Sequence, residues 1–371
     1  MSESVVVIGG GVIGLLCARN LRASGVQTVV LDRQAVGRES SWAGAGIASP
    51  LYPTRYPPSI FALTRSSQVE YAAMVPDLEQ TSGIDIEWRQ SGLIIADPDR
   101  NGPESDARLK QMFAPEEYKF LRATEIHRIE PRLAVSSDAL LLTRLAQVRN
   151  SRLVKALRIA LEKTGVVIQE GREVVGFEVD RGHLCAIKTT NGVIPATRCI
   201  VAAGAWTGTL LAGQGIELGI RPIRGEILLL KGPANFLNHV VVRRYRYLVP
   251  RSDGHVLVGS TLDDVGFDKS TTEEGRRSLY EAAVALAPGL GDFEITGHWA
   301  GLRPSSPDDL PFIGEHPGVG GLFVCAGHYR NGFATGPATA RIAVDLVLGK
   351  KTAVDPIPFR LDRSVPMVQH S

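Results

Sequence analysis

Short apolar runs alternate with a helix-spaced apolar pattern at the start of the chain. One run covers 4–8, a pattern with hydrophobic residues every three or four positions continues to Ser24, and a second run covers 29–31. A helix-spaced segment between two short apolar runs is typical of a helix that connects two buried parallel strands. The pattern therefore predicts a strand, a helix and a strand within 4–33.

The same alternation returns further along the chain. Leu153, Leu157 and Leu161 share one face of a helix predicted over Ser151–Lys163, and Gly165 is a typical helix end. Further strands are predicted at 166–169, 173–179, 184–189, 198–202 and 322–326, followed by a helix at 336–349. This alternation indicates that these segments belong with the N-terminal unit.

Consecutive strands without intervening helices dominate another part of the chain. They are predicted at 225–230, 240–242, 245–249 and 256–259. Strands in direct succession are typical of an antiparallel sheet. The remaining predicted elements are a helix at 61–79 that Pro76 kinks or breaks, a strand region at 88–96, a helix at 125–129, and a helix at 272–287 capped by Thr271 or Thr272.

These elements predict an α/β chain with two domains. We expect a Rossmann-like nucleotide-binding domain built from the discontinuous segments 1–85, 146–220 and 296–371. A second domain with an antiparallel sheet is expected from 86–145 and 221–295. A length of 371 residues agrees with two domains, because one ordinary core rarely grows so large.

Composition and charge narrow the class of partner. The chain is 44% hydrophobic and 22% charged, as in globular proteins, and its net charge of +2 argues against nucleic acid as a partner. The densest basic cluster is Arg243-Arg244-Tyr245-Arg246, which we interpret as a solvated face or a substrate funnel. No signal peptide is visible and no run reaches the length of a membrane span, so we expect a cytoplasmic protein without membrane insertion.

The four cysteines show no metal-binding or disulfide pattern. They are far apart, form no CxxC, and have no histidine at metal-ligand spacing, so no metal site is predicted. We expect buried free thiols, which suit a reducing cytosol, at Cys17, Cys185, Cys199 and Cys325.

The glycine motif at 9–14 carries the first chemical signal. Gly9 allows a tight turn, Gly11 allows the backbone to approach a pyrophosphate, and Gly14 allows the helix to pack closely on the strand. The helix N-terminus carries partial positive charge for the phosphates, and Asp32 ends the next strand, where a carboxylate accepts hydrogen bonds from a ribose. An ordinary glycine-rich turn is the alternative interpretation.

A loop of small residues follows at 37–47. Small side chains let backbone N–H groups approach a ligand closely. A flexible linker is the alternative, although Trp42 and its apolar neighbours argue against a purely solvated one.

Two arginines and a tyrosine are candidates for binding a carboxylate. Arg303 lies between an apolar stretch and Pro304, where its planar guanidinium suits a carboxylate; the alternative is a structural arginine satisfied by backbone carbonyls. Arg330 follows a buried strand, where ligands bind in open α/β sheets. Tyr247 offers a phenol, although a strand tyrosine is more often plain packing. His328 is a candidate general base, but contact with a cofactor explains it better.

Taken together, five segments resemble the D-amino acid oxidase superfamily of flavoenzymes, in its glycine oxidase (ThiO) branch. They are Gly9–Gly14 with Asp32, the loop Ser40–Ile47, Val201-Ala202-Ala203-Gly204-Ala205-Trp206, Gly301-Leu302-Arg303-Pro304, and His328-Tyr329-Arg330-Asn331-Gly332. The resemblance covers essentially the full chain, and its last two motifs are far more specific than the glycine motif. Asp32 stands where members of the family often carry Glu.

The resemblance implies FAD as the cofactor, held without a covalent bond because no cysteine lies near Arg303. The implied cofactor contacts are Gly9, Gly11, Val12, Ile13, Gly14, Asp32, Arg33, Ser40, Ser41, Ala45, Gly46, Ile47, Val174, Gly204, Trp206, Gly301, His328, Tyr329, Arg330, Asn331, Gly332, Phe333 and Ala334. The implied substrate contacts are Tyr247, Leu262, Arg303 and Arg330, with Arg303 holding the carboxylate.

The implied activity is oxidative deamination of glycine, sarcosine or small D-amino acids, with oxygen as acceptor and release of hydrogen peroxide, for thiamine biosynthesis. The resemblance also implies a homo-oligomer, a tetramer or a dimer. The alternatives are a dehydrogenase or oxidase for D-amino acids or N-substituted glycines, and a flavoprotein subunit without catalysis. An NAD-dependent dehydrogenase fits less well, because the antiparallel part and the C-terminal glycine turn suit a flavin.

Overall fold

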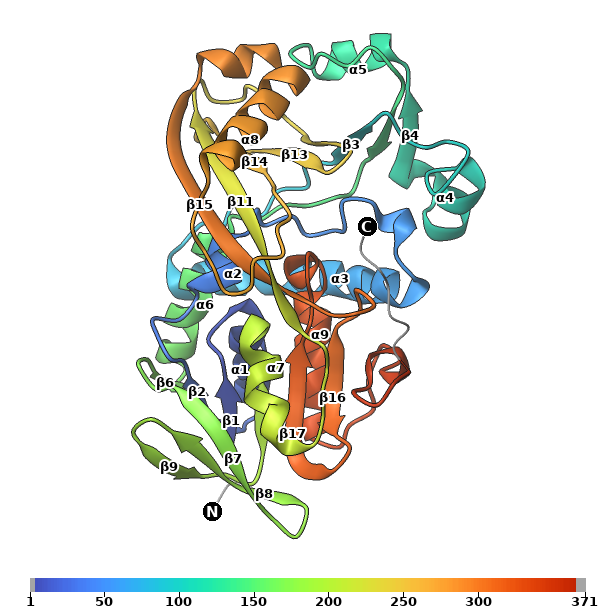
Figure 1. Cartoon of the computed structure of the whole chain (residues 1–371). Helices are drawn as coiled ribbons and strands as arrows, with labels where there is room; N and C mark the ends of the chain where they lie inside the picture. The colour runs from blue at the N-terminus through green and yellow to red at the C-terminus, as the bar shows by residue number, and fades with distance from the viewer. Residues whose placement is uncertain (1–3, 365–371) are drawn as a thin grey trace.

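Two β-sheets, one above the other in Figure 1, organise the computed structural model of the chain. The structure describes residues 4–364. Within them, one sheet has nine strands and the other has eight. Strands β11 (Arg221–Lys231) and β15 (Glu294–Ser305) run from the upper half toward the lower sheet and connect the two halves (Figure 1).

The nine-stranded sheet is built around the N-terminal strand β1 (Ser4–Ile8). β1 pairs in parallel with β2 (Gln27–Leu31) and with β10 (Cys199–Val201), and β10 pairs in parallel with β17 (Val319–Ala326). The other strands of this sheet are β6 (Val167–Gln169), β7 (Val174–Asp180), β8 (His183–Thr189), β9 (Gly192–Pro195) and β16 (Phe312–His316). The parallel centre confirms the predicted Rossmann-like fold.

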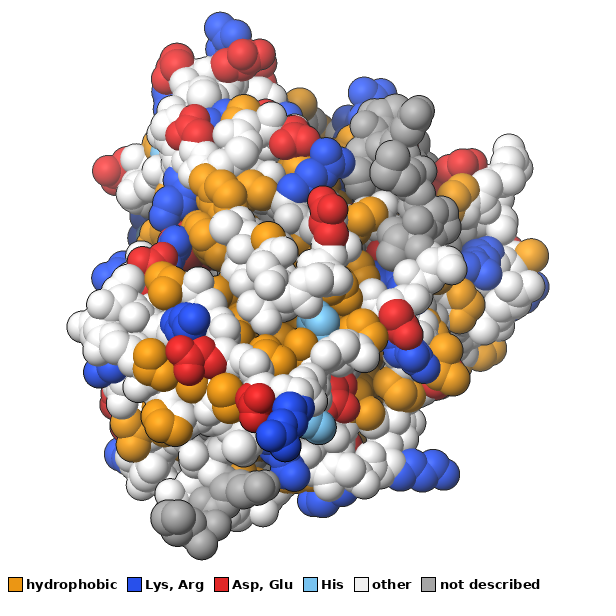
Figure 2. All heavy atoms as spheres, turned by 60° about the horizontal axis from the view of Figure 1, so that its bottom comes forward, with side chains coloured by type: hydrophobic (Ala, Val, Ile, Leu, Met, Phe, Trp, Pro, Cys, Tyr) orange, Lys and Arg blue, Asp and Glu red, His pale blue; other side chains and the backbone are white. Residues whose placement is uncertain are grey.

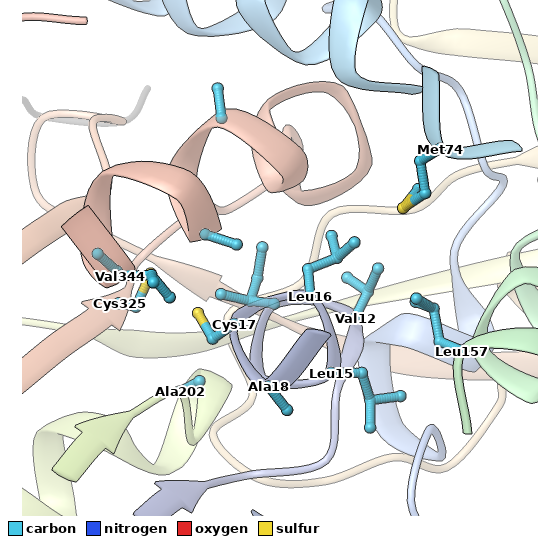
Figure 3. Close-up of a cluster of buried hydrophobic side chains, with 14 of the residues drawn as sticks. Val12, Leu15, Leu16, Cys17, Ala18, Met74, Leu157, Ala202, Cys325 and Val344 are labelled. Carbon is cyan, nitrogen blue, oxygen red and sulfur yellow. The ribbon is translucent and has the colours of Figure 1, made fainter. Parts of the chain in front are cut away.

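Helices pack beside this sheet through their apolar faces. They are α1 (Val12–Ala23), α3 (Pro58–Ser82), α6 (Asn150–Lys163) and α9 (Gly332–Val347), and they contact one another as well as the strands. Figure 3 shows the centre of the resulting core, where Leu16, Cys17 and Val344 are fully or almost fully buried. Each leucine buried in this way stabilises the fold by about 1.5–3 kcal/mol.

The approach of α1 to β1 depends on Gly14, as the sequence predicted. A Cβ atom at Gly14 would lie 1.9 Å from the carbonyl oxygen of Gly9. No larger residue fits there without moving the helix. The glycine therefore determines where the N-terminus of α1 lies relative to the strand ends.

The eight-stranded sheet has the order β15-β11-β14-β13-β12-β3-β5-β4. Its remaining strands are β3 (Leu93–Ala96), β4 (Tyr118–Leu121), β5 (Ala139–Leu142), β12 (Val240–Arg243), β13 (Arg246–Pro250) and β14 (His255–Gly259). The four strands predicted in 225–259 are all present, and their pairs with one another and with β15 are antiparallel.

The two faces of this sheet have different neighbours because side chains alternate along a strand. Leu248 and Val258 form a buried cluster with Leu279 of helix α8 (Glu273–Leu286). Tyr247 and Val249 point to the opposite face. Thr272 caps α8, since its hydroxyl accepts a hydrogen bond from the Gly275 N–H at 2.9 Å.

Several elements differ from their predictions. Helix α3 continues through Pro76 to Ser82, because it packs along α6 and α9, and α9 begins at Gly332 rather than at 336. Tyr245 lies in the turn before β13, not in the strand. The predicted strand region 88–96 contains only β3, and β4, β5, β9 and β16 were not predicted.

Cys185 was predicted to be buried, and this is wrong. The structure describes buried thiols at Cys17, Cys199 and Cys325 but an exposed one at Cys185. Cys185 lies on the outer face of β8, in the antiparallel ribbon that β8 forms with β7 and β9. One face of such a ribbon commonly meets solvent.

The remaining α-helices of the described chain are short: α2 (Glu39–Ala43), α4 (Asp106–Met112), α5 (Ala123–Ile129) and α7 (Thr207–Leu211). None of the helices in 4–364 is long and apolar enough to cross a membrane. Figure 2 shows Lys and Arg side chains interspersed with Asp and Glu over the face that it draws. β15 extends past the boundary expected at 296, and the division into two domains stays a prediction.

Candidate active site

A cavity of about 1220 Å³ lies between the two sheets. The glycine loop after β1, the loop at 37–47, one face of the second sheet and the turn after β17 all line it. Every predicted site residue lines this cavity except Gly14 and Ala334. Gly14 acts through packing, as described above, and Ala334 is buried in α9.

The glycine loop forms the floor at the N-terminus of α1. Gly9 has a φ of +104°, and a Cβ atom there would lie 2.4 Å from the carbonyl oxygen of Ala202. The N-cap of α1 is Gly11, which has no capping side chain. The Val12 N–H donates to the Ser41 hydroxyl at 2.9 Å. This open helix start suits a phosphate, because its N–H groups and dipole attract anions.

Asp32 stands beside this loop at the end of β2. Its carboxylate accepts hydrogen bonds from the Gly10 N–H at 2.7 Å and the Gln34 N–H at 2.9 Å. Burial raises the pKa of Asp32, while the two backbone hydrogen bonds oppose the shift. A carboxylate has about four acceptor positions, so it keeps capacity for ribose hydroxyls.

The loop at 37–47 is fixed to the rest of the protein and is not a flexible linker. The Asn150 side-chain amide donates to the carbonyl oxygens of Ser41 and Trp42 at 3.0 and 2.5 Å. The buried guanidinium of Arg251 donates to the carbonyl oxygen of Ala45 at 2.8 Å. A Cβ atom at Gly46 would lie 1.9 Å from the Val148 carbonyl oxygen. The loop therefore presents a preformed wall to the cavity.

Arg303 projects from β15 into the cavity. Its Nη1 donates to the carbonyl oxygens of Arg224 and Thr261, both at 3.3 Å, and its Nη2 donates to the Ser260 hydroxyl at 2.5 Å. Burial lowers the pKa of Arg303, and Tyr247 acts in the opposite direction. Within 4–364, no carboxylate lies at ion-pair distance from Arg303. A buried guanidinium held by neutral partners is suited to an incoming carboxylate.

Two glycines that the sequence analysis missed make room for the candidate substrate residues. A Cβ atom at Gly225 would lie 2.0 Å from both terminal nitrogens of Arg303. A Cβ atom at Gly259 would lie 2.1 Å from Cζ of Tyr247. Gly225 lies inside β11 and Gly259 ends β14, and a glycine in a strand often marks a close approach. That signal was present in the sequence, but not the identity of the approaching groups.

Arg330 and Tyr329 lie at the same end of the cavity as Arg303. Arg330 donates to the Tyr329 hydroxyl at 3.2 Å, and both groups influence the pKa of Arg303. Tyr56 also lines the cavity, and burial raises its pKa, although a hydrogen bond with Asn331 opposes the rise. Tyr56 was not predicted, because it lies in a proline-rich segment without a motif. Leu262 is at the rim and is 51% exposed.

His328 is neutral in the folded protein. It is buried, its Nε2 lies 3.3 Å from the Thr339 hydroxyl, and burial lowers its pKa from 6.5 to about 3. Such a weak base is unsuited to removing a substrate proton near neutral pH. This agrees with the interpretation of His328 as a cofactor neighbour rather than a general base.

The same burial predicts a pH dependence of stability. Between about pH 6.5 and pH 3 the unfolded chain protonates His328 and the folded protein does not, so stability falls as the pH drops through this window. From pH 7 to pH 5 we expect the wild type to lose about 2 kcal/mol more unfolding free energy than His328→Gln. Urea titrations at both pH values measure this difference, and equal losses would contradict the burial argument.

Comparisons with known proteins agree with this geometry. The family model "DAO: FAD dependent oxidoreductase" matches residues 4–346. The chain is 42% identical over 364 residues to the glycine oxidase of Pseudomonas putida, across 97% of this chain and 98% of that protein. It is 31% identical to the bifunctional protein ThiO/ThiG of Nostoc sp., across 100% of this chain and 57% of that protein.

The fold is also that of a solved relative. The crystal structure of glycine oxidase from Geobacillus kaustophilus matches with a TM-score of 0.92 at 31% identity, across 98% of this chain and 99% of that one. The glycine loop, the open start of α1 and Asp32 fit the FAD that the family binds. The chain therefore belongs to the family of FAD-dependent oxidoreductases, on the branch that contains the glycine oxidases.

Proposed function

We propose that this chain oxidises glycine and small glycine-like amines, such as sarcosine and small D-amino acids. The observation that carries the proposal is that Arg303 and Tyr247 line the same cavity as the glycine loop and the 37–47 loop. The P. putida and G. kaustophilus relatives, both named glycine oxidase, support the same substrate class.

The residues of this chain act mainly by binding and orientation. Arg303 pairs with the substrate carboxylate, and the Tyr247 hydroxyl donates a further hydrogen bond to it. Holding the carboxylate places the α-carbon at a constant position relative to the cofactor, which lowers the entropic part of the barrier. Arg330 and Leu262 border the position of the amine and its substituent, where they influence substrate size.

The glycine loop, Asp32 and the 37–47 loop would hold FAD without a covalent link. The bound flavin would supply the redox chemistry, as a hydride acceptor for the α-carbon that oxygen reoxidises to give hydrogen peroxide. The amine loses its extra proton before this step. His328 is poorly suited to accept this proton, because burial lowers its pKa to about 3. The imino acid that leaves the site hydrolyses to glyoxylate and ammonia when the substrate is glycine.

A substrate panel tests this proposal. We expect peroxide release with glycine and sarcosine, and oxygen consumption that an artificial electron acceptor does not increase. Turnover only with an artificial acceptor would instead support a dehydrogenase of the same fold. Flavin that no amine reduces would support a non-catalytic flavoprotein.

The biological setting is part of the same proposal. The similarity to a bifunctional ThiO/ThiG protein supports a role in thiamine biosynthesis. We also propose a cytoplasmic homo-oligomer, a tetramer or a dimer. Deletion of the gene, followed by growth with and without thiamine, tests the pathway assignment.

A further inference from the structure

One segment lies between the candidate substrate residues, such as Tyr247 and Arg303, and the cavity residues near Asp32. Residues 262–270, here called the bridging segment, connect the end of β14 to the start of α8. They belong to the part of the chain that carries Tyr247, yet they contact residues of the nucleotide-binding part. Three of their side chains make the contacts described below: Phe267, Asp268 and Lys269.

Phe267 contacts a residue beside the nucleotide end of the cavity. Its ring centroid lies 5.3 Å from that of Trp206, with 31° between the ring planes. The guanidinium carbon of Arg33 lies 3.8 Å from the centroid of a Trp206 ring. Arg33 and Trp206 both line the cavity, as do Asp32 and Val174. The family resemblance implies that Asp32, Arg33 and Val174 contact the adenosine end of FAD. Phe267 itself is 46% exposed, so core packing alone does not account for it.

Lys269 makes the second contact between the bridging segment and the nucleotide-binding part. Its ammonium lies 3.1 and 3.3 Å from the two carboxylate oxygens of Glu39. Arg33 also pairs with Glu39, at 3.1 Å. Glu39 lines the cavity at the start of α2, where an uncompensated carboxylate would repel a pyrophosphate. The two cations offset this negative charge.

The other side of the bridging segment is anchored beside the substrate residues. Arg224 pairs with Asp268 at 3.0 Å, and its backbone exchanges two hydrogen bonds with Asp263. The carbonyl oxygen of the same Arg224 accepts a hydrogen bond from Arg303. Movement of the segment away from the nucleotide end would therefore disturb the residues that hold Arg303.

We propose that the bridging segment is a cofactor clamp, in which Phe267 and Lys269 retain the adenosine end of FAD by bracing Trp206, Arg33 and Glu39. Phe267 fixes Trp206 and, through it, Arg33. Lys269 neutralises Glu39 near the pyrophosphate. The clamp concerns retention of the cofactor, so it goes beyond the proposed substrate and does not depend on it.

The test measures FAD binding rather than turnover. FAD is removed from the purified full-length protein and titrated back, with flavin fluorescence as the readout. We expect Phe267→Ala to raise the Kd for FAD about tenfold. Lys269→Gln is expected to raise it about threefold at low ionic strength and less at high salt, because salt screens exposed charges. Phe267→Tyr should bind FAD within twofold of the wild type.

Val265 provides the matched control. It lies in the same segment and is 42% exposed, but it takes no part in the stack or the ion pair. Val265→Ala should leave the Kd for FAD within twofold of the wild type. Unchanged Kd values for both Phe267→Ala and Lys269→Gln would overturn the clamp, as would an equal rise in Val265→Ala. If Phe267→Ala does not fold, the Kd of Lys269→Gln for FAD and its salt dependence decide whether the clamp is correct.

The clamp and the proposed function fail in different ways. If the protein does not oxidise glycine but Phe267→Ala weakens FAD binding, the clamp stands and the proposed function is wrong. If the protein oxidises glycine but Phe267→Ala and Lys269→Gln both bind FAD as tightly as the wild type, the proposed function stands and the clamp is wrong.

Discussion

Replacing Arg303 with alanine is expected to lower kcat/KM for glycine about tenfold to a few hundredfold. The substitution removes a charge-assisted contact to the substrate carboxylate, and such contacts contribute roughly 1.5–3 kcal/mol. Most of the loss should appear as a higher KM, because the carboxylate is bound before and during the reaction. Steady-state kinetics with oxygen consumption as the readout measure both constants.

Arg303→Lys separates the effect of the positive charge from that of the planar guanidinium. Lysine keeps the positive charge but cannot offer the planar pair of donors, so we expect an intermediate kcat/KM. The FAD content of all three proteins should be equal, since Arg303 is proposed to hold substrate and not cofactor. If Arg303→Ala keeps wild-type kcat/KM for glycine, the carboxylate assignment is wrong.

Gly225→Ala is expected to weaken substrate binding about tenfold without unfolding the protein. The new methyl group would lie 2.0 Å from both terminal nitrogens of Arg303, so the guanidinium must move. The φ angle of Gly225 is not in the left-handed region, and the colliding atoms end a flexible side chain. The fold therefore accommodates the change. The KM for glycine and the Kd of a carboxylate competitor such as acetate should rise together.

Gly176→Ala is the matched control for this variant. Gly176 also lies within a strand, and a Cβ atom there would have no heavy atom within 4 Å. Gly176→Ala should keep wild-type KM, and both variants should show similar urea midpoints. A wild-type KM in Gly225→Ala would mean that Arg303 does not bind substrate in its present position.

The nucleotide-binding half was predictable from the sequence because its signals are local. The apolar run at 4–8, the glycines at 9–14 and the helical pattern to Ser24 lie next to one another in the chain, and the structure reproduces them as β1, the loop and α1. The motifs around Arg303 and Arg330 were also readable as short segments. Every predicted site residue except Gly14 and Ala334 meets in one cavity.

Features that depend on distant pairing were not predictable in the same way. β3 pairs with β5 and β12, and β5 also pairs with β4. Each of these strands has only four residues, and its sequence does not indicate which strand it pairs with. The role of Gly225 depends on the register that places it opposite Gly301, two residues from Arg303. Tyr56 lines the cavity and forms a hydrogen bond with Asn331, a residue far away in the chain, which local spacing cannot predict.

Anaerobic addition of glycine to the FAD-loaded protein shows whether the bound amine reduces the flavin. If Arg303 orients glycine for hydride transfer, the visible absorbance of oxidised flavin should disappear, and admission of oxygen should restore it. The Arg303→Ala protein should need a much higher glycine concentration for the same change. If neither glycine, sarcosine nor D-alanine alters the flavin spectrum, the protein is not an oxidase of small amino acids.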